Sequence, residues 1–290
     1  CKRSTSIEEE MNRVILIMLV HLSLIHAQDE LLELIIEEKD ISIPVQATFK
    51  ATRIVNAQSI ELPRPKTLEF MILHRFGSMK DRFYNLFGMD EAVIRFDLKY
   101  GFNDKLSFGV GRSSLDKTYD FFTKVKLLNQ TNGQKPIPVS VGIFSKVEIQ
   151  SIDKDLVMID RLTFDLQALI SRKMNRSLSL QIMPTLIHRN LVEDEDALHD
   201  LFSLGIGGRI KLTNRTSINF DTFLPLGHRP NSFIQSWGLG CDIETGGHVF
   251  QLMVTNAQGS YESKYVEHAT GRFENLNLYL GFNISRVFSL

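Results

Sequence analysis

Beyond residue 66, apolar and polar side chains alternate along the chain with a period of two residues. Between residues 92 and 100, for example, the even positions are apolar or aromatic, and the odd positions include Arg95, Asp97 and Lys99. This alternation predicts β-strands that are apolar on one face and polar on the other. About twelve segments carry the pattern, and the last of them, NLNLYLGFNISRVFSL, covers residues 275–290.

The segments that connect these strands alternate between short and long. Short turns are expected at residues 102–104, 129–133, 173–176, 213–215 and 244–247, and longer loops at 77–91, 151–160, 190–199, 225–232 and 256–275. The loop after Arg112 is of intermediate length. An even number of strands with tight turns at one rim and long loops at the other is typical of bacterial outer-membrane barrels.

The polar faces distinguish between the all-β architectures that this pattern allows. Sandwiches and lipocalin-like barrels also use two-faced strands. However, about twelve strands with their apolar faces turned inward would enclose an apolar cavity far too wide to fill. If the apolar faces meet lipid instead, the sheet must close so that every backbone group is paired. The sequence therefore predicts an all-β fold: a closed antiparallel transmembrane β-barrel of about twelve strands, after a short helical or extended N-terminal lead-in.

In such a barrel, the charged residues of the polar faces line the lumen. The predicted lumen-lining residues are Glu69, Arg75, Arg95, Asp97, Lys99, Lys124, Lys126, Lys146, Glu148, Arg161, Asp165, Arg209, Lys211, Asp221 and Asp242. Together with Asp120 they carry nine positive and seven negative charges, which nearly cancel. Two interpretations stay open: a narrow polar pore with a weak anion preference, or a lumen closed by cross-barrel ion pairs and by the lead-in. Near-balance slightly favours the closed lumen, because unpaired charge in a narrow lumen is costly.

The final strand has the features of a barrel-closing element. Leu280, Phe282, Ile284, Phe288 and Leu290 lie on its apolar face, and we expect them to close the ring and to form the signal that the barrel-insertion machinery reads. Arg286 interrupts this face near a membrane edge, where its head can reach water. Elsewhere, Pro184 lies inside a strand pattern and predicts a β-bulge, because proline donates no backbone hydrogen bond.

The N-terminal region predicts export. Residues 11–27 combine a short positive start at Arg13, a run of twelve mostly apolar residues and a small residue before position 28, as a secretory signal peptide does. A spanning anchor would need about 20 apolar residues. Residues 1–10 are interpreted as an upstream, non-native segment, residues 28–66 as a periplasmic or lumen-inserted lead-in, and residues 67–290 as the barrel. The expected location is the outer membrane.

Composition excludes several other classes of protein. The chain has 290 residues and a formal net charge of −1, so nucleic acid is not expected as a partner. Its two cysteines, Cys1 and Cys241, are too few for a disulfide scaffold or a four-ligand zinc site. No cofactor is expected.

Candidate catalytic chemistry is sparse. His74 and His188 fall near the outer strand ends, where surface enzymes of this class hold their active sites, but no G-x-S-x-G motif is present. Interfacial histidines are the favoured interpretation. The acidic run at residues 192–196 suggests either a solvated loop or a site for bridging cations, and the solvated loop is favoured because calcium-loop spacing is absent.

Several strings in the chain resemble one protein family. They are ATFKATRIVN, LHRFG, FGVGRSSLDKTYDFF, LLNQTNGQKPIPVSV, MPTLIHRNLV, DIETGGHVFQLMVTNAQG and LGFNISRVFSL. They are similar to the uncharacterised outer-membrane β-barrel family of Bacteroidota-type bacteria known as domain of unknown function 5777, from about residue 46 to residue 290. The resemblance implies an outer-membrane barrel that follows a cleaved signal peptide, and it implies no activity.

Three functions follow from these features, in decreasing order of support. The first is a narrow, passive or gated pore for small polar solutes. The second is a non-transporting membrane scaffold or anchor for a periplasmic or surface partner. The third is a surface lipid-modifying enzyme, although no catalytic constellation is recognisable. The expected partners are outer-membrane lipid, the barrel-insertion machinery, and either small polar solutes or a periplasmic partner.

Overall fold

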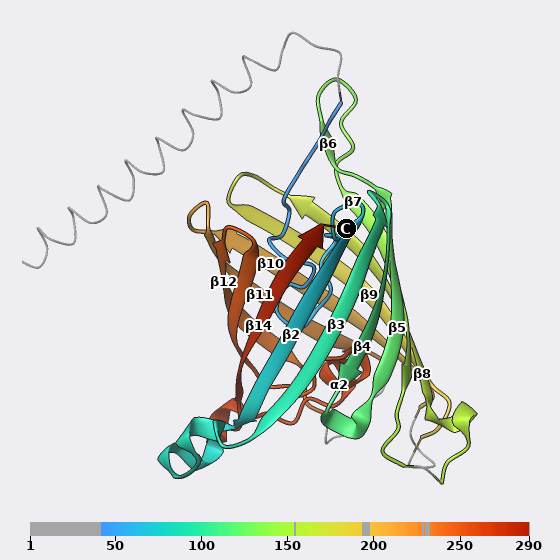
Figure 1. The fold of residues 1–290 in the computed structure, drawn as a ribbon, viewed down its shortest axis with the longest axis vertical. Coiled ribbons are helices and arrows are strands. Elements are labelled where there is room, and N and C mark those ends of the chain that lie inside the picture. Colours follow the sequence, from blue (N-terminus) through green and yellow to red (C-terminus); the bar gives the residue numbers. More distant parts are fainter. Residues whose placement is uncertain (1–41, 154, 193–197, 228, 230–232, 290) are drawn as a thin grey trace, which may run out of the picture. The chain divides into compact units, whose positions relative to one another are not determined.

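A computed structural model describes residues 42–289, apart from residues 154, 193–197, 228 and 230–232. The predicted signal peptide and Leu290 therefore lie outside the described residues. Among the described residues, twelve strands form one closed antiparallel barrel (Figure 1). The barrel strands are β2 (Thr67–Ser78), β3 (Ala92–Asn103), β4 (Leu106–Ser113), β5 (Tyr119–Leu128), β7 (Ser140–Ile149), β8 (Leu162–Lys173), β9 (Leu178–Arg189), β10 (Asp200–Lys211), β11 (Thr216–Leu226), β12 (Trp237–Thr245), β13 (His248–Thr255) and β14 (Tyr279–Ser289). The predicted fold class is confirmed.

The ring closes where the last strand pairs with the first. β14 lies antiparallel to β2 with Ile284 opposite Ile72, and one register shift occurs between Tyr279 and Gly281. Every other barrel strand pairs with its neighbours in chain order, so the twelve strands form one continuous ring. Within the barrel no strand edge is therefore left unpaired, as a sheet in lipid requires.

The two faces of the wall follow the alternation in the sequence. In β2, the side chains of Glu69 and Arg75 point inward and are buried, whereas Phe70 and Ile72 point outward and are partly exposed. Other outward-facing residues with large exposure are Phe96, Leu98, Val110, Phe121, Leu166, Ile182, Leu239 and Leu252. An apolar outer wall of this kind suits acyl chains rather than water.

The connections differ between the two ends of the barrel. At one end, here called the short-turn rim, tight turns lie at residues 104–105, 174–177, 212–215 and 246–247. The opposite end, the long-loop rim, carries the connections at residues 79–91, 114–118, 150–161, 190–199, 227–236 and 256–278. Both ends of the barrel sequence, at Thr67 and Ser289, lie at the short-turn rim (Figure 1).

Two local predictions were wrong. The turn expected at residues 129–133 runs from 129 to 139, because Thr131–Asn132 (β6) extends to pair with Ile43–Pro44 (β1) in a separate two-stranded sheet. Ile43 and residues 131–136 belong to a small unit of their own. Pro184 causes no bulge: β9 keeps one register with β10 through Pro184, and with β8 the pairs of Ala168 and Leu169 drop out without an inserted residue.

The helical segments are short and lie in the connections. They are η1 (Met79–Gly88), η2 (Leu115–Lys117), η3 (Met158–Arg161), α2 (Glu262–Glu267) and η4 (Phe273–Asn275). Within the described part of the chain, none of the helices has the length and apolar character needed to cross a bilayer.

Candidate functional site

Residues 46–66 form a hairpin inside the barrel, here called the lumen hairpin (Figure 1). Its two arms are joined by a bridge between Arg53 and Gln58, and the amide of Ile54 donates to the carbonyl oxygen of Ala57 over 2.8 Å, which closes a tight turn. Residues 48–60 are almost all buried. The hairpin therefore fills part of the space that the strands enclose.

Both arms of the lumen hairpin start from the short-turn rim. The Lys173 ammonium donates to the carbonyl oxygen of Gln46 over 2.9 Å, and Lys50 binds Glu244 at the same rim. On the other arm, the amide of Lys66 donates to the carbonyl oxygen of Gly101 over 2.7 Å, and β2 begins one residue later. The segment thus enters and leaves through one end of the barrel.

The tip of the hairpin is held by one carboxylate. Oδ2 of Asp221, on β11, accepts hydrogen bonds from the backbone amides of Val55, Asn56 and Ala57 at 3.0, 2.7 and 2.8 Å. Successive amides that converge on one anion form a strong, charge-assisted contact. Asp221 therefore fixes how deep the tip reaches.

Along the arms, wall side chains satisfy the hairpin's backbone. The Lys124 ammonium donates to the carbonyl oxygens of Thr52, Ser59 and Glu61 at 3.1, 2.8 and 3.2 Å. The Gln181 side chain accepts from the amide of Ile60 over 2.9 Å and donates to the carbonyl oxygen of Gln58 over 2.7 Å. Because an unpaired buried carbonyl is costly, these wall residues stabilise the inserted segment.

One side of the hairpin is apolar. Ile54, Val55 and Ile60 belong to a buried apolar cluster that includes Met183 and Phe223 on the inner wall. Small wall residues make room for it: a Cβ added to Gly207 would lie 2.6 Å from Ile54 Cδ1, and one added to Gly238 would lie 2.8 Å from Val55 Cγ1. The wall and the hairpin are thus shaped to each other on this side.

A second segment enters from the long-loop rim. In the β13–β14 loop, residues 256–278, the side chains of Tyr261, Glu262 and Tyr265 are buried. Glu262 Oε1 accepts a hydrogen bond from Gln58 Nε2 over 2.8 Å and lies 3.8 Å from an Arg53 guanidinium nitrogen. The loop and the lumen hairpin therefore meet inside the barrel, and together they occupy it from both ends.

Where they meet, charged side chains form a buried network, here called the central ion network. Its members are Arg53, Arg95, Asp97, Asp120, Lys146, Glu148 and Glu262. Arg95 binds Asp97 at 2.7 Å and Asp120 at 2.5 Å, and Lys146 binds Glu148 at 3.1 Å and also Glu262. Wall, hairpin and loop are linked by these contacts.

Nearer the long-loop rim, Glu267 ends α2 beside Arg189, whose guanidinium lies 2.7 Å from it. Burial raises the pKa of the Glu267 carboxyl to about 7, although Arg189 favours the ionised form. This carboxyl therefore titrates within the ordinary working range of pH.

The structure places most of the predicted lumen-lining residues on the inner face of the wall, buried. These are Glu69, Arg75, Arg95, Asp97, Lys99, Lys124, Lys146, Glu148, Asp165, Arg209, Asp221 and Asp242. Lys126 and Lys211 share the inner parity but are half-buried at the short-turn rim. Arg161 does not line the lumen: it ends η3 and donates twice to the carbonyl oxygen of Leu156, because the chain is still turning there and β8 has not begun.

The sequence did not predict the ion-pair partners that non-strand segments bring to the inner wall. Arg53 and Glu262 complete the central ion network, yet neither lies on a strand. Inward-facing Phe144, Met183 and Phe223 were also not predicted, because a single apolar residue on a polar face does not show that it packs against an inserted segment. The one local signal was the glycine-rich stretch from Gly205 to Gly208, where small residues leave space beside the wall.

The two candidate catalytic histidines lie apart from this network. The ring of His74 is on the outer wall, stacked on Phe282 with 4.8 Å between centroids. His188 Nδ1 lies 2.7 Å from an Asp200 carboxylate oxygen near the long-loop rim. In the part of the chain that the structure describes, no serine hydroxyl is hydrogen-bonded to either ring.

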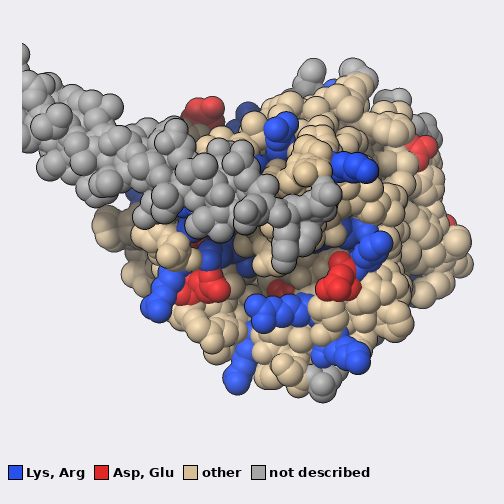
Figure 2. All heavy atoms as spheres, turned by 90° about the horizontal axis from the view of Figure 1, so that it is seen from above, with Lys and Arg blue, Asp and Glu red and all other residues tan. Residues whose placement is uncertain are grey.

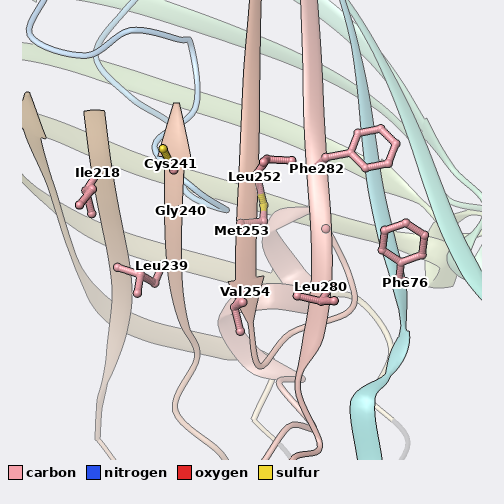
Figure 3. A pocket seen from close by; sticks show the side chains of 11 residues that line it. Phe76, Ile218, Leu239, Gly240, Cys241, Leu252, Met253, Val254, Leu280 and Phe282 are labelled. Atoms are coloured by element: carbon pink, nitrogen blue, oxygen red, sulfur yellow. The ribbon is translucent and has the colours of Figure 1, made fainter. Parts of the chain in front are cut away.

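A shallow apolar groove on the outer wall includes part of the predicted closing strand. Figure 3 shows Leu280 and Phe282 of β14 beside Leu252 and Val254 of β13, with Phe76 of β2 at the edge. Ile284 and Phe288 share the outward parity of β14. Such a groove on a lipid-facing wall fits acyl chains.

Comparisons with solved structures find porins of low sequence identity. A NanC porin matches with a TM-score of 0.47 and 8% identity over 77% of this chain and 99% of that chain. A KdgM porin, also solved with disordered oligogalacturonate, matches with a TM-score of 0.45 and 8% identity over 77% of this chain and 99% of that chain. The outer membrane protein Omp33 of Acinetobacter baumannii matches with a TM-score of 0.44 and 9% identity over 80% of this chain and all of that chain.

Among curated proteins, none matches this sequence. The family model described as "Membrane bound beta barrel domain (DUF5777)" matches residues 49–288. This range includes eleven complete barrel strands, β14 up to its penultimate residue and most of the lumen hairpin. The chain therefore belongs to the family of membrane-bound β-barrel domains DUF5777.

Proposed function

We propose that this protein is a gated pore for small polar solutes in the outer membrane of a Bacteroidota-type bacterium, and that the structure corresponds to its closed state. The observation that carries the proposal is the way the lumen is closed. The closing segment is a hairpin distinct from the wall, and it is bound largely through wall groups such as Lys124 and Asp221 that water can also satisfy. A wall of this kind can hydrate when the hairpin leaves.

The orientation follows from the two rims. In outer-membrane barrels the short turns face the periplasm and the long loops face outward. The lumen hairpin would then enter from the periplasm, downstream of a cleaved signal peptide at residues 11–27, and the β13–β14 loop would enter from the cell surface. A periplasmic partner that pulls on the lead-in would be able to open the pore.

The short-turn rim favours solutes that carry negative charge. Figure 2 shows this end of the molecule with Lys and Arg side chains more abundant than Asp and Glu. The turns and adjoining strand ends carry Lys105, Arg172, Lys173, Arg176, Lys211 and Arg215 against Asp104 and Glu244. A basic mouth raises the local concentration of anions.

A second function, a non-transporting scaffold or anchor, is supported by a different observation. Ile54, Val55 and Ile60 pack in a buried apolar cluster with Phe223 and Met183, and such packing is lost when a segment moves into water. If the hairpin never leaves, the barrel holds a partner at the membrane instead of conducting. An enzyme is not part of the proposal.

Planar-bilayer recording separates the two functions. The wild-type barrel should conduct rarely. A variant in which residues 47–62 of the hairpin and residues 259–268 of the β13–β14 loop are each replaced by a short Gly-Ser linker should conduct continuously, because the two linkers remove both closing segments. Circular dichroism and heat-modifiable migration serve as controls that the variant is still a barrel. If the folded variant shows no conductance, the pore proposal fails. Affinity purification of the protein from membranes then tests the scaffold function, which predicts that the same partner protein is recovered each time.

A further inference from the structure

The central ion network carries more negative than positive charge. Its cations are Arg53, Arg95 and Lys146, and its carboxylates are Asp97, Asp120, Glu148 and Glu262. A fifth carboxylate, Asp165 on β8, lies beside them: single oxygens of Glu148, Asp165 and Glu262 are all within 4.8 Å of one another. With every group ionised, the cluster has two negative charges in excess.

Among these carboxylates, Asp165 is the one without a neighbouring hydrogen-bond donor or paired cation in the described residues. Its side chain is 2% exposed, and neither of its carboxylate oxygens receives a hydrogen bond from the described residues. By contrast, Lys146 and Ser263 contact Glu148, while Lys146 and Gln58 contact Glu262. A buried carboxylate without a donor or a cation is strongly disfavoured.

We propose that Glu148, Asp165 and Glu262 bind one calcium ion inside the barrel. A divalent cation would match the two excess charges and would supply the counterpart that Asp165 lacks. Calcium takes six to eight oxygen ligands in flexible geometry, and three bidentate carboxylates would supply six of them. Magnesium demands near-ideal octahedral geometry and usually keeps several waters, so calcium suits a site made of buried carboxylates better.

The position of the site gives it a role in closure. Glu148 and Asp165 belong to the wall, on β7 and β8, whereas Glu262 belongs to α2 in the β13–β14 loop. One ion bound by all three would fasten the loop to the wall at the point where the loop meets the lumen hairpin. The site does not depend on solute transport, and a scaffold would hold it equally well.

The test uses the full-length barrel, refolded in detergent with EDTA and then dialysed against Ca²⁺. Calcium content by mass spectrometry and the unfolding temperature are measured for wild type, for Asp165→Asn, and for the control Asp242→Asn. Asp242 is also a buried inner-wall carboxylate, but it bonds Gln251 and Ser217 outside the cluster. Wild type and the control should bind about one ion and melt at a higher temperature with Ca²⁺, and Asp165→Asn should lose roughly tenfold or more in calcium affinity.

Two results would overturn the site. Wild type without bound calcium, and with the same unfolding temperature in EDTA and in Ca²⁺, would mean that Asp165 and Glu148 share a proton instead. Equal calcium binding in all three proteins would place the ion elsewhere. If Asp165→Asn does not fold, Glu148→Gln takes its place in the same comparison, and its failure to reduce calcium binding would count against the site in the same way.

Discussion

Two wall side chains, Asp221 and Lys124, make most of the charged contacts to the backbone of the lumen hairpin. Asp221 gathers three backbone amides of the hairpin tip, and Lys124 satisfies three carbonyl oxygens of its arms. Hydrogen bonds to charged groups contribute about 1.5–3 kcal/mol each when they replace water contacts. A few wall residues therefore hold in place a segment that has no strand pairing with the wall.

Substitution of Asp221 tests this directly. In Asp221→Asn the side chain keeps its size but loses its charge, so the amides of Val55, Asn56 and Ala57 should exchange with deuterium at least about tenfold faster, a loss of roughly 1.4 kcal/mol or more. Asp104→Asn, an exposed carboxylate in the β3–β4 turn, should not change these rates. Unaltered exchange at residues 55–57 in Asp221→Asn would show that apolar packing alone holds the tip.

We expect the contribution of the β13–β14 loop to stability to depend on pH. Glu267 at the end of α2 has a pKa of about 7 in the folded protein, above the ordinary value of 4.5, because burial disfavours its charge. The folded state therefore binds more protons than the unfolded state between these values. The contribution of the protonated Glu267 carboxyl to the free energy of unfolding is therefore complete below about pH 4.5 and is lost as pH rises through about 7.

Urea unfolding from pH 4 to 8 measures this contribution. The free energy of unfolding of wild type relative to Glu267→Gln should fall by up to about 1.4 kcal/mol per pH unit within the window and level off above it. Glu274→Gln, an exposed carboxyl of the same loop, should behave as wild type. A wild-type curve that runs parallel to the Glu267→Gln curve would show that Glu267 is already ionised when folded.

The strands were predictable from the sequence, but the segments that fill the barrel lumen were not. Period-two alternation, such as that of β3 around Arg95 and Asp97, is local information, and charge on one face identifies the face that avoids lipid. The pairing of Arg53 with Asp97 and of Glu262 with Lys146 joins segments far apart in the chain, and no local pattern marks which loops fold inward. Arg161 was misplaced for a related reason, since alternation does not mark the residue at which a strand begins.

For the molecule as a whole, two segments from opposite ends close a polar barrel and meet at a charged network. This arrangement combines a wall that can hydrate with a hairpin that fits wall glycines, as at Gly207 and Gly238. In the proposed pore, conduction would depend on this hairpin and on the β13–β14 loop that meets it. The hairpin would have to move away from the wall before solutes could pass.

A reversible cross-link between hairpin and wall tests that requirement most directly. Val55 Cγ2 lies 3.4 Å from the position of a Cβ built on Gly240 of β12, so Val55→Cys with Gly240→Cys can form a disulfide in a background that carries Cys241→Ser. Single-channel conductance is recorded in planar bilayers for the oxidised and the reduced protein, with each single cysteine variant as the control. If the hairpin gates the pore, no openings should occur when the disulfide is formed, and openings should return to the wild-type frequency after reduction. Equal conductance in the oxidised and reduced states would contradict it, because solutes would then pass without movement of the hairpin.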